Sequence, residues 1–143
     1  GWSYKYARRQ WNLVDNKELC YCYLGDFDKA MIKTIKSEKN FNKTPVQEIW
    51  HNDGDQVLAY MRGDLLFVFN FSPTRSFTGY GFLVPTGAYS IVLDTDNKEF
   101  GGNGLNDDSM THLTTYDPLY VGDRKEWLKL YLPARSALVL KKN

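Results

Sequence analysis

Histidine and cysteine side chains are the first candidates for catalysis or metal binding in this 143-residue sequence, which contains two of each. His51 and His112 lie far apart, without a cysteine or carboxylate at the spacing that zinc ligands adopt. Cys20 and Cys22 occupy alternate positions of one segment, which is a poor geometry for a disulfide between them. We therefore expect reduced cysteines, histidines without a ligand role, and no bound metal.

Carboxylates and glycine-rich segments offer no clearer site. Asp94-Thr95-Asp96-Asn97 has the opening spacing of a calcium loop, but Glu99 stands where such a loop needs glycine, so we expect a turn with solvated carboxylates. Gly102-Asn103-Gly104 neither follows a clear strand nor opens a helix, which excludes a dinucleotide-binding fingerprint. No acidic residue lies in a motif that selects it for glycoside chemistry. The residues therefore predict no catalytic side chain and no cofactor.

Aromatic side chains are numerous, with 8 Phe, 10 Tyr and 4 Trp. A sugar ring has an apolar face that stacks on tryptophan or tyrosine, so an exposed group of such residues could bind a glycan. Most aromatic residues of a small domain fill its core, and only some can contact sugar. The candidates are Trp2, Tyr4, Trp11, Tyr80, Tyr120 and Trp127.

Charge is nearly balanced, with 18 Lys and Arg against 17 Asp and Glu and a net charge of +1. This balance argues against nucleic-acid binding, which needs a basic face. No apolar run is long enough to cross a membrane, and no secretion signal opens the sequence. Together with reduced cysteines, these observations predict a cytoplasmic protein. Because the sequence begins with Gly1 rather than methionine, we expect it to be part of a longer protein.

The strongest helical pattern covers residues 27–36, where apolar residues recur at spacings of three and four. Asp26 is suitably placed to cap the N-terminus of this helix. A single helix cannot bury its apolar face alone, so another layer must cover it. That face contains Phe27, Ala30, Met31 and Ile35.

A domain boundary is predicted at the polar segment 37–45, which ends with Pro45 and is typical of a linker. Residues 1–45 carry nine basic and five acidic side chains, whereas residues 46–143 carry nine basic and twelve acidic ones. This asymmetry also indicates two structural pieces.

Beyond the linker, the hydrophobic period changes to two residues, which is typical of strands. The expected strands cover residues 56–62, 65–71, 88–94, 111–116, 127–132 and 136–141. Gly63-Asp64 predicts a hairpin turn, so we interpret Arg62-Gly63-Asp64, a tripeptide that integrins bind, as structural. Turn signals between six short strands predict an antiparallel β-sandwich.

Both faces of the expected strand 65–71 are apolar. Alternation places Phe67, Phe69 and Phe71 on one face and Leu66 and Val68 on the other. One face should fill the sandwich core, and the other should meet either the N-terminal segment or a domain missing from this chain. The long glycine-rich loop 94–110 is a further candidate for function.

Several short motifs occur in order along nearly the whole sequence. They are Trp2-Ser3-Tyr4, Arg8-Arg9-Gln10-Trp11 with Leu13, Phe27-Asp28 with Ala30-Met31, Arg62-Gly63-Asp64-Leu65 with Phe67-Val68-Phe69-Asn70-Phe71, Pro85 with Gly87 and Tyr89, Leu93-Asp94 with Asp96, Phe100-Gly101-Gly102, and Pro133-Ala134-Arg135-Ser136-Ala137. No single motif is specific. As a series, they resemble the C-terminal end of the 1,4-α-glucan (glycogen or starch) branching enzymes of the α-amylase superfamily.

The resemblance implies that residues 1–44 are the last loop and helix of a catalytic (β/α)₈ barrel and that residues 45–143 form an all-β sandwich domain. Enzymes of this family cut an α-1,4-glucan and transfer the released segment to a 6-hydroxyl, using paired carboxyl groups. In the family these carboxyl groups lie upstream of Gly1. The resemblance therefore implies a chain that is inactive alone, whose helix packs on the missing barrel.

The leading expectation is therefore that this chain supports the catalytic barrel of an enzyme of glycogen biosynthesis, without catalytic residues of its own, and that it contacts the α-glucan. The candidate glucan contacts are Trp2 and Tyr4, which border the end of the barrel, and Tyr120 and Trp127. Two alternatives stay open. One is an independent carbohydrate-binding module, and the other is the C-terminal domain of an amylase or debranching hydrolase, which shares the fold.

Overall fold

The computed structural model describes residues 21–39, 41–117 and 125–143, with side chains from residue 29 onward. Its helices are α2 (Tyr21–Lys36) and the short 3₁₀ helices η1 (Phe41–Lys43) and η2 (Lys98–Phe100). Its strands are β1 (Val46–Asn52), β2 (Val57–Arg62), β3 (Leu65–Asn70), β4 (Phe77–Phe82), β5 (Ala88–Asp94), β6 (Thr111–Leu113), β7 (Thr115–Tyr116), β8 (Glu126–Leu132) and β9 (Ser136–Lys142).

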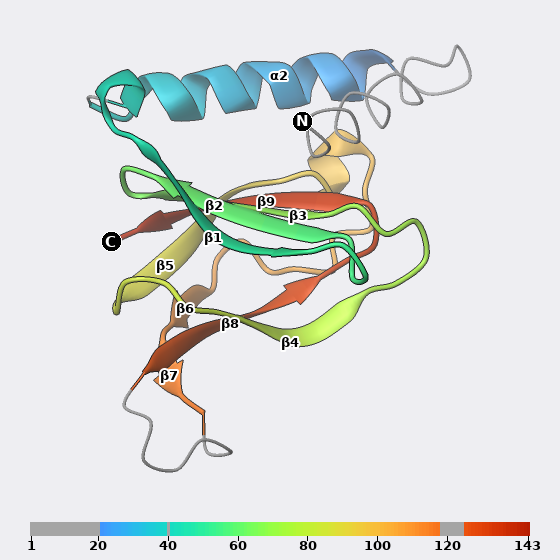
Figure 1. The fold of residues 1–143 in the computed structure, drawn as a ribbon. Coiled ribbons are helices and arrows are strands. Elements are labelled where there is room, and N and C mark those ends of the chain that lie inside the picture. Colours follow the sequence, from blue (N-terminus) through green and yellow to red (C-terminus); the bar gives the residue numbers. More distant parts are fainter. Residues whose placement is uncertain (1–20, 40, 118–124) are drawn as a thin grey trace.

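Two antiparallel sheets form the body of the protein (Figure 1). The larger sheet has the strand order β1-β2-β3-β9-β5-β6, and the smaller one has the order β4-β8-β7. The chain passes from the larger sheet to the smaller one between β3 and β4, and again between β6 and β7. The predicted mainly β fold, an antiparallel sandwich preceded by a short helix, is confirmed.

Alternating burial explains why these segments pair as two facing layers. In β2, Val57, Ala59 and Met61 are buried, and the residues between them are half-buried. In β8, Leu128 and Leu130 are buried on either side of the exposed Lys129. These side chains meet between the sheets with Leu66 and Val68 of β3 and with the inward residues of β5 and β9. Burying each leucine-sized side chain contributes about 1.5–3 kcal/mol to folding.

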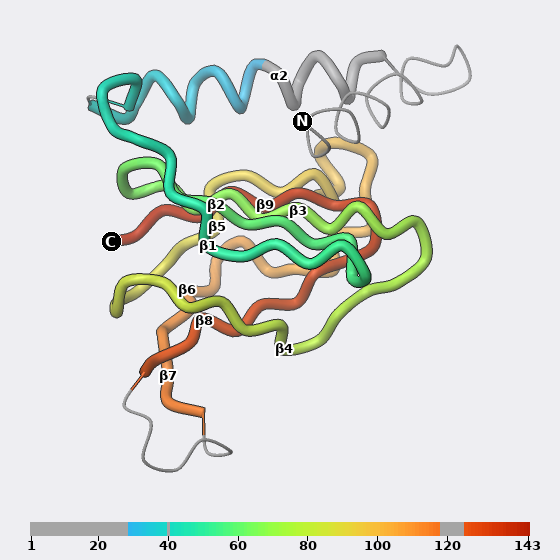
Figure 2. Tube along the Cα trace, viewed as in Figure 1, coloured from blue at the N-terminus to red at the C-terminus, as the bar shows by residue number. Residues whose placement is uncertain are grey.

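A second apolar layer lies between the larger sheet and α2, which crosses the outer face of that sheet (Figures 1 and 2). Leu65 and Phe67 of β3 are buried there, and Ala30 and Met31 of the helix pack against the same cluster. The second apolar face of β3 therefore meets the N-terminal segment, which was one of the two expected layers. Met31 was expected to face a missing barrel, and the structure instead places it on the sheet.

The helix and two strands differ from the sequence prediction. α2 already includes residues 21–26, so Asp26 lies inside the helix and is not its N-cap. β1 was not predicted because it is an edge strand with mostly exposed residues. β4 was not predicted because Gly79 and Gly81 interrupt its apolar pattern. The expected strand 111–116 is divided into β6 and β7, which belong to different sheets.

The segment between α2 and β1 is held against the sheet by Arg62. Its Nε donates to the Thr44 carbonyl at 2.9 Å, and Nη2 donates to the Asn42 carbonyl at 3.0 Å. The guanidinium also lies 4.7 Å from the centre of the Phe41 ring. The predicted hairpin turn is confirmed, with Gly63 at a φ of +62°. Arg62 thus has a structural role, as the sequence indicated.

In the described part of the chain, no helix combines the length and apolar character needed to cross a membrane. The predicted boundary between residues 44 and 45 stays a prediction.

Candidate functional site

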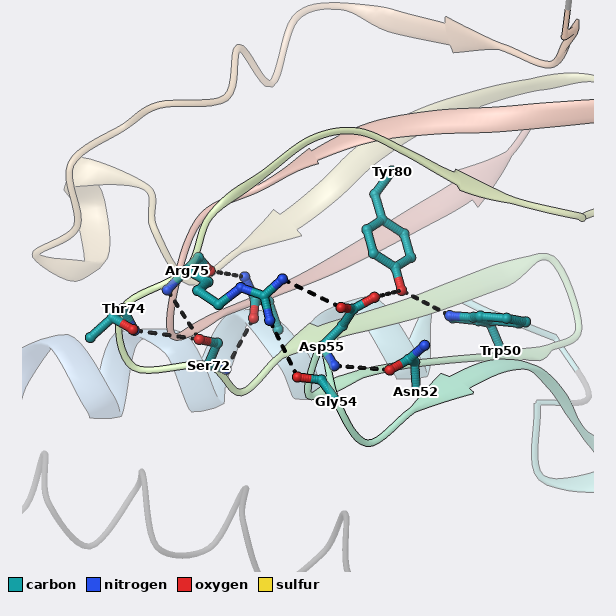
Figure 3. Close-up of polar contacts among 9 residues, drawn as sticks. Trp50, Asn52, Gly54, Asp55, Ser72, Thr74, Arg75 and Tyr80 are labelled. Carbon is teal, nitrogen blue, oxygen red and sulfur yellow. Dashed lines mark hydrogen bonds and ion pairs between the residues drawn. The ribbon is translucent and has the colours of Figure 1, made fainter. Parts of the chain in front are cut away.

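A chain of hydrogen bonds joins the two sheets at one edge of the sandwich (Figure 3). The indole Nε1 of Trp50, on β1, donates to the hydroxyl of Tyr80, on β4, at 2.9 Å. The Tyr80 hydroxyl in turn donates to Asp55 Oδ2 at 2.8 Å. Because β1 and β4 are edge strands of their sheets, this cluster lies at the side of the sandwich rather than in its core.

Arg75, from the loop between β3 and β4, continues the cluster. Its Nη2 lies 3.5 Å from Asp55 Oδ1, and its Nη1 donates to the Gly54 carbonyl at 3.3 Å. The guanidinium is also 4.8 Å from the centre of the Phe77 ring. We call Trp50, Asp55, Arg75 and Tyr80 together the edge cluster.

Turn geometry fixes Asp55 and Arg75 on their loops. The Asp55 amide donates to Asn52 Oδ1 at 2.9 Å, which is a local side-chain cap of the β1–β2 turn. The Arg75 amide donates to Ser72 Oγ at 3.0 Å. The Arg75 carbonyl accepts a hydrogen bond of 2.9 Å from Asn70 Nδ2. The backbone of both residues is therefore held by short polar side chains next to the cluster.

The edge cluster is accessible and bears a balanced charge. Trp50 is 45% exposed, and the Arg75 side chain is 56% exposed. Burial raises the pKa of Tyr80 to about 12, with a further contribution from the Asp55 carboxylate, which accepts a hydrogen bond from the hydroxyl; the hydrogen bond from Trp50 and the charge of Arg75 oppose this shift. Tyr80 is therefore a neutral hydroxyl at physiological pH, able to accept from Trp50 and donate to Asp55 together. The arrangement suits binding of a polar ligand beside an aromatic ring.

Of the aromatic residues that the sequence suggested, Tyr80 lies in this cluster. Trp2, Tyr4, Trp11 and Tyr120 lie outside the described residues. Trp127 is half-buried on the outward side of β8 and packs over the neighbouring strand β4. A Cβ atom added to Gly81 would lie 3.6 Å from Trp127 Cε3, so the Trp127 ring covers the backbone at that glycine.

The long loop after β5 is held by Asp94 and Asp96, so the expectation that these carboxylates are solvated is wrong. Asp96 is buried, and its Oδ1 and Oδ2 accept the amides of Asn103 and Leu105 at 3.1 and 3.2 Å. Asp94 is only 1% exposed, and one oxygen accepts the Asp96 amide at 2.8 Å. Backbone amides thus replace water around these groups. The described residues contain no group of three or more His, Cys, Asp or Glu side chains arranged for a metal.

Sequence reasoning missed Trp50, Asp55 and Arg75. Trp50 follows Ile49 in a strand whose polar and apolar residues do not alternate, and Asp55 belongs to a polar turn that has no recognisable motif. Arg75 and Tyr80 reach them only because the chain changes sheets between β3 and β4. The one usable signal was a tryptophan in a short segment, Val46–Asn52, in which four of the seven residues are polar.

Comparison with known proteins places the chain in a family. Residues 49–143 match the family model described as alpha amylase, C-terminal all-beta domain. The 1,4-alpha-glucan-branching enzyme of Saccharomyces cerevisiae is 42% identical over 141 residues, which cover 98% of this chain and 20% of that protein. The enzyme of the same name from Eremothecium gossypii is 42% identical over 144 residues, covering 100% of this chain and 20% of the relative.

A third relative, the 1,4-alpha-glucan-branching enzyme of Emericella nidulans, is 44% identical over 140 residues, or 96% of this chain and 20% of that protein. The chain therefore spans about a fifth of the length of the curated relatives it matches. The match of the β-domain and the similarity over nearly every residue confirm the resemblance first seen in the motifs. The chain belongs to the α-amylase C-terminal all-β domain family and is similar throughout to the C-terminal region of 1,4-α-glucan-branching enzymes.

Proposed function

We propose that this chain is the non-catalytic C-terminal domain of a cytoplasmic branching enzyme of glycogen biosynthesis, and that it supports the catalytic barrel and contacts the α-glucan. The observation that carries this proposal is identity of about 42% to proteins named 1,4-alpha-glucan-branching enzyme, extending over both the helix and the sandwich. The relatives are about five times longer, so most of each relative has no counterpart in this chain.

The chemistry of the described residues supports a non-catalytic role. Transfer with retention at a sugar carbon needs one carboxylate as nucleophile and a second carboxyl group as acid and base. The two most buried carboxylates of the described segments, Asp94 and Asp96, accept backbone amides and hold a loop. Asp55 is bound to Tyr80 and Arg75. These contacts are typical of structural or ligand-binding carboxylates.

The packing of α2 supports a role in joining the sandwich to a catalytic domain. One side of the helix packs on the larger sheet through Ala30 and Met31. Ile32 is 52% exposed, and Lys29, Lys33 and Lys36 are also exposed. We propose that this outward side contacts the barrel, so that α2 connects the two domains rigidly.

A branching assay tests the non-catalytic role. The purified chain is incubated with amylose, and branching is followed by the fall in iodine absorbance and by isoamylase digestion of the product. We expect no change, whereas a full-length branching enzyme run in parallel should reduce the absorbance. New α-1,6 branches made by this chain alone would overturn the proposal.

An independent carbohydrate-binding module is the second candidate, and the exposed edge cluster favours it. Such a module would bind glucan without help from another domain, whereas a purely supporting domain would not bind it alone. Trp127 and Tyr120 stay candidate contacts for this function. If Trp127 or Tyr120 contacts the glucan, its replacement by alanine should weaken retention by glucan. The effect can be compared with that of substitutions in the edge cluster, which is a separate site.

A further inference from the structure

We propose that the edge cluster of Trp50, Asp55, Arg75 and Tyr80 is a binding site for internal segments of an α-1,4-linked glucan chain. The proposal rests on the glucan contact included in the proposed function and assigns it to particular residues. Two parts of the cluster match two properties of a sugar: an aromatic ring matches the apolar face of a pyranose, and a carboxylate beside a guanidinium matches its hydroxyl groups.

Trp50 is the aromatic part. Nearly half of this large side chain remains exposed, so a ligand can bury apolar surface against it. Its Nε1 donates to Tyr80 at 2.9 Å, which fixes the position of the ring before any ligand arrives. A fixed ring loses little conformational entropy on binding, and this is why preorganised aromatic residues make effective contact surfaces.

Asp55 and Arg75 are the polar part. The Asp55 carboxylate has about four lone-pair positions, and one contact from Tyr80 and one from Arg75 leave acceptor capacity for hydroxyl groups. Arg75 has five N–H donors, and the contacts of Nη1 and Nη2 to Gly54 and Asp55 leave further donors. Neighbouring hydroxyls of one sugar can therefore donate to Asp55 and accept from Arg75.

Charge favours a neutral polyol over an anionic ligand. The Arg75 guanidinium is 3.5 Å from the Asp55 carboxylate, so the pair presents little net charge. The same β1–β2 segment carries the exposed Glu48 and Asp53, which lie 3.4 and 3.1 Å from His51. These carboxylates oppose the approach of a phosphate or a nucleic acid.

The position of the cluster favours the middle of a chain over its end. β1 and β4 are the edge strands of the two sheets, and the Trp50–Tyr80 bond joins them along the side of the sandwich. A long polymer can lie across such an open side and continue in both directions. We therefore expect binding to depend on chain length and not on a free reducing or non-reducing end.

Titration with maltoheptaose, monitored by the indole N–H signals of the four tryptophans in a proton–nitrogen correlation spectrum, tests the site directly. The spectrum of a Trp50→Phe variant assigns the Trp50 signal. We expect that signal to shift with saturation while the Trp127 signal changes little. Maltoheptaose whose reducing end has been converted to the alditol should produce the same shift of the Trp50 signal.

Native gels containing glycogen provide the variant test. Trp50→Ala should weaken retention about tenfold, which corresponds to about 1.4 kcal/mol. Tyr80→Phe should weaken it several-fold, because the Trp50 ring loses its acceptor. Tyr116→Ala is the matched control, since Tyr116 is 59% exposed on β7 of the smaller sheet. It should change retention less than twofold.

The outcomes separate this site from the proposed function. A shift of other indole signals without that of Trp50, together with normal retention of Trp50→Ala, would place the glucan elsewhere and overturn the site alone. No shift of any indole signal and no retention by glycogen would overturn both the site and the glucan contact of the domain. Circular dichroism of each variant shows whether the fold is intact.

Discussion

Trp50 and Tyr80 are 30 positions apart in sequence, yet the indole nitrogen of one lies 2.9 Å from the hydroxyl of the other. Trp50 belongs to the larger sheet and Tyr80 to the smaller one, so this hydrogen bond links the two layers at their edge (Figure 3). Asp55 completes the link because its Oδ2 accepts a hydrogen bond of 2.8 Å from the Tyr80 hydroxyl. The bond therefore stabilises the sandwich and fixes an exposed ring in the same place.

Removal of the Tyr80 hydroxyl should lower stability as well as glucan binding. Tyr80→Phe keeps the ring in the apolar cluster but removes one hydrogen bond to Trp50 and one to the Asp55 carboxylate. We expect the free energy of unfolding to fall by about 1–2 kcal/mol, as measured by urea denaturation. The control Tyr116→Phe, at an exposed position, should change it by less than about 0.5 kcal/mol. Equal effects of the two variants would contradict the assigned role of the Tyr80 hydroxyl.

Asn70 should be one of the most sensitive polar positions of the domain. It is buried, and its Nδ2 lies 2.9 Å from the Arg75 carbonyl, 3.2 Å from the Leu132 carbonyl and 3.1 Å from the Pro133 carbonyl. Asn70→Ala would remove the donor that these carbonyls share, although Ser136 Oγ would still donate to the Pro133 carbonyl, and it would also remove the acceptor of the Ser72 amide. We therefore expect a loss of about 2–4 kcal/mol in thermal or urea unfolding.

The exposed Asn103 provides the comparison for Asn70, because Asn103 binds Asp96 through its backbone amide and not through its side chain. Asn103→Ala should therefore change stability by less than about 0.5 kcal/mol. If Asn70→Ala proved equally harmless, Asn70 would not be the residue that joins the β3–β4 loop to the end of β8.

Gly102 should not tolerate a side chain. A Cβ atom there would lie 2.1 Å from the Asp96 carbonyl oxygen and 2.5 Å from Asp96 Cα, and backbone atoms cannot move aside cheaply. We expect Gly102→Ala to destabilise the protein by more than about 2 kcal/mol in thermal unfolding. Gly81→Ala is the control, since its nearest neighbour would be Trp127 Cε3 at 3.6 Å. A normal melting temperature for Gly102→Ala would show that the loop can rearrange.

Asp94 should make stability fall as pH rises through weakly acidic values. Burial, with smaller contributions from Asp108 and Asp96, raises the pKa of Asp94 from 3.8 to about 6, although the Asp96 amide opposes the shift. Its Oδ2 has no hydrogen-bond partner among the described residues. Between these two pKa values the folded protein holds a proton that the unfolded chain has released, so folding is favoured at the lower pH.

The stabilisation from a protonated Asp94 is complete below about pH 4 and is lost as pH rises through about 6. The loss amounts to roughly 3 kcal/mol at most. Asp94→Asn has no such titration, so its stability relative to the original chain should increase between pH 4 and pH 7 in urea denaturation experiments. A constant difference across this range would show that Asp94 has an ordinary pKa in the folded protein.

The local sequence pattern predicted two kinds of strand: those in which buried and exposed residues alternate, and those that are buried on both faces of the sheet. The hairpin of β2 and β3 was predicted because strand-forming residues flank Gly63-Asp64, and β8 was predicted because Leu128, Leu130 and Leu132 alternate with polar or half-buried residues. Burial on one or both faces leaves a signature in the sequence itself.

The edge strands and the edge cluster leave much weaker signatures. Most residues of β1 are exposed, so little selection for alternation acts on it, and Gly79 and Gly81 make β4 resemble a turn. Asp55 and Arg75 meet Trp50 and Tyr80 only through the tertiary passage of the chain from one sheet to the other. No short-range spacing can predict such a meeting.

The mobility of the unmodified chain in native gels with increasing glycogen tests the central claim most directly. The claim is that this domain contacts α-1,4-glucan without carrying out the branching reaction. We predict progressive retardation by glycogen and no retardation by the α-1,6-linked polymer dextran, relative to a reference protein without glucan affinity. Identical mobility in glycogen, in dextran and in plain gels would contradict the claim and leave support of the barrel as the only role.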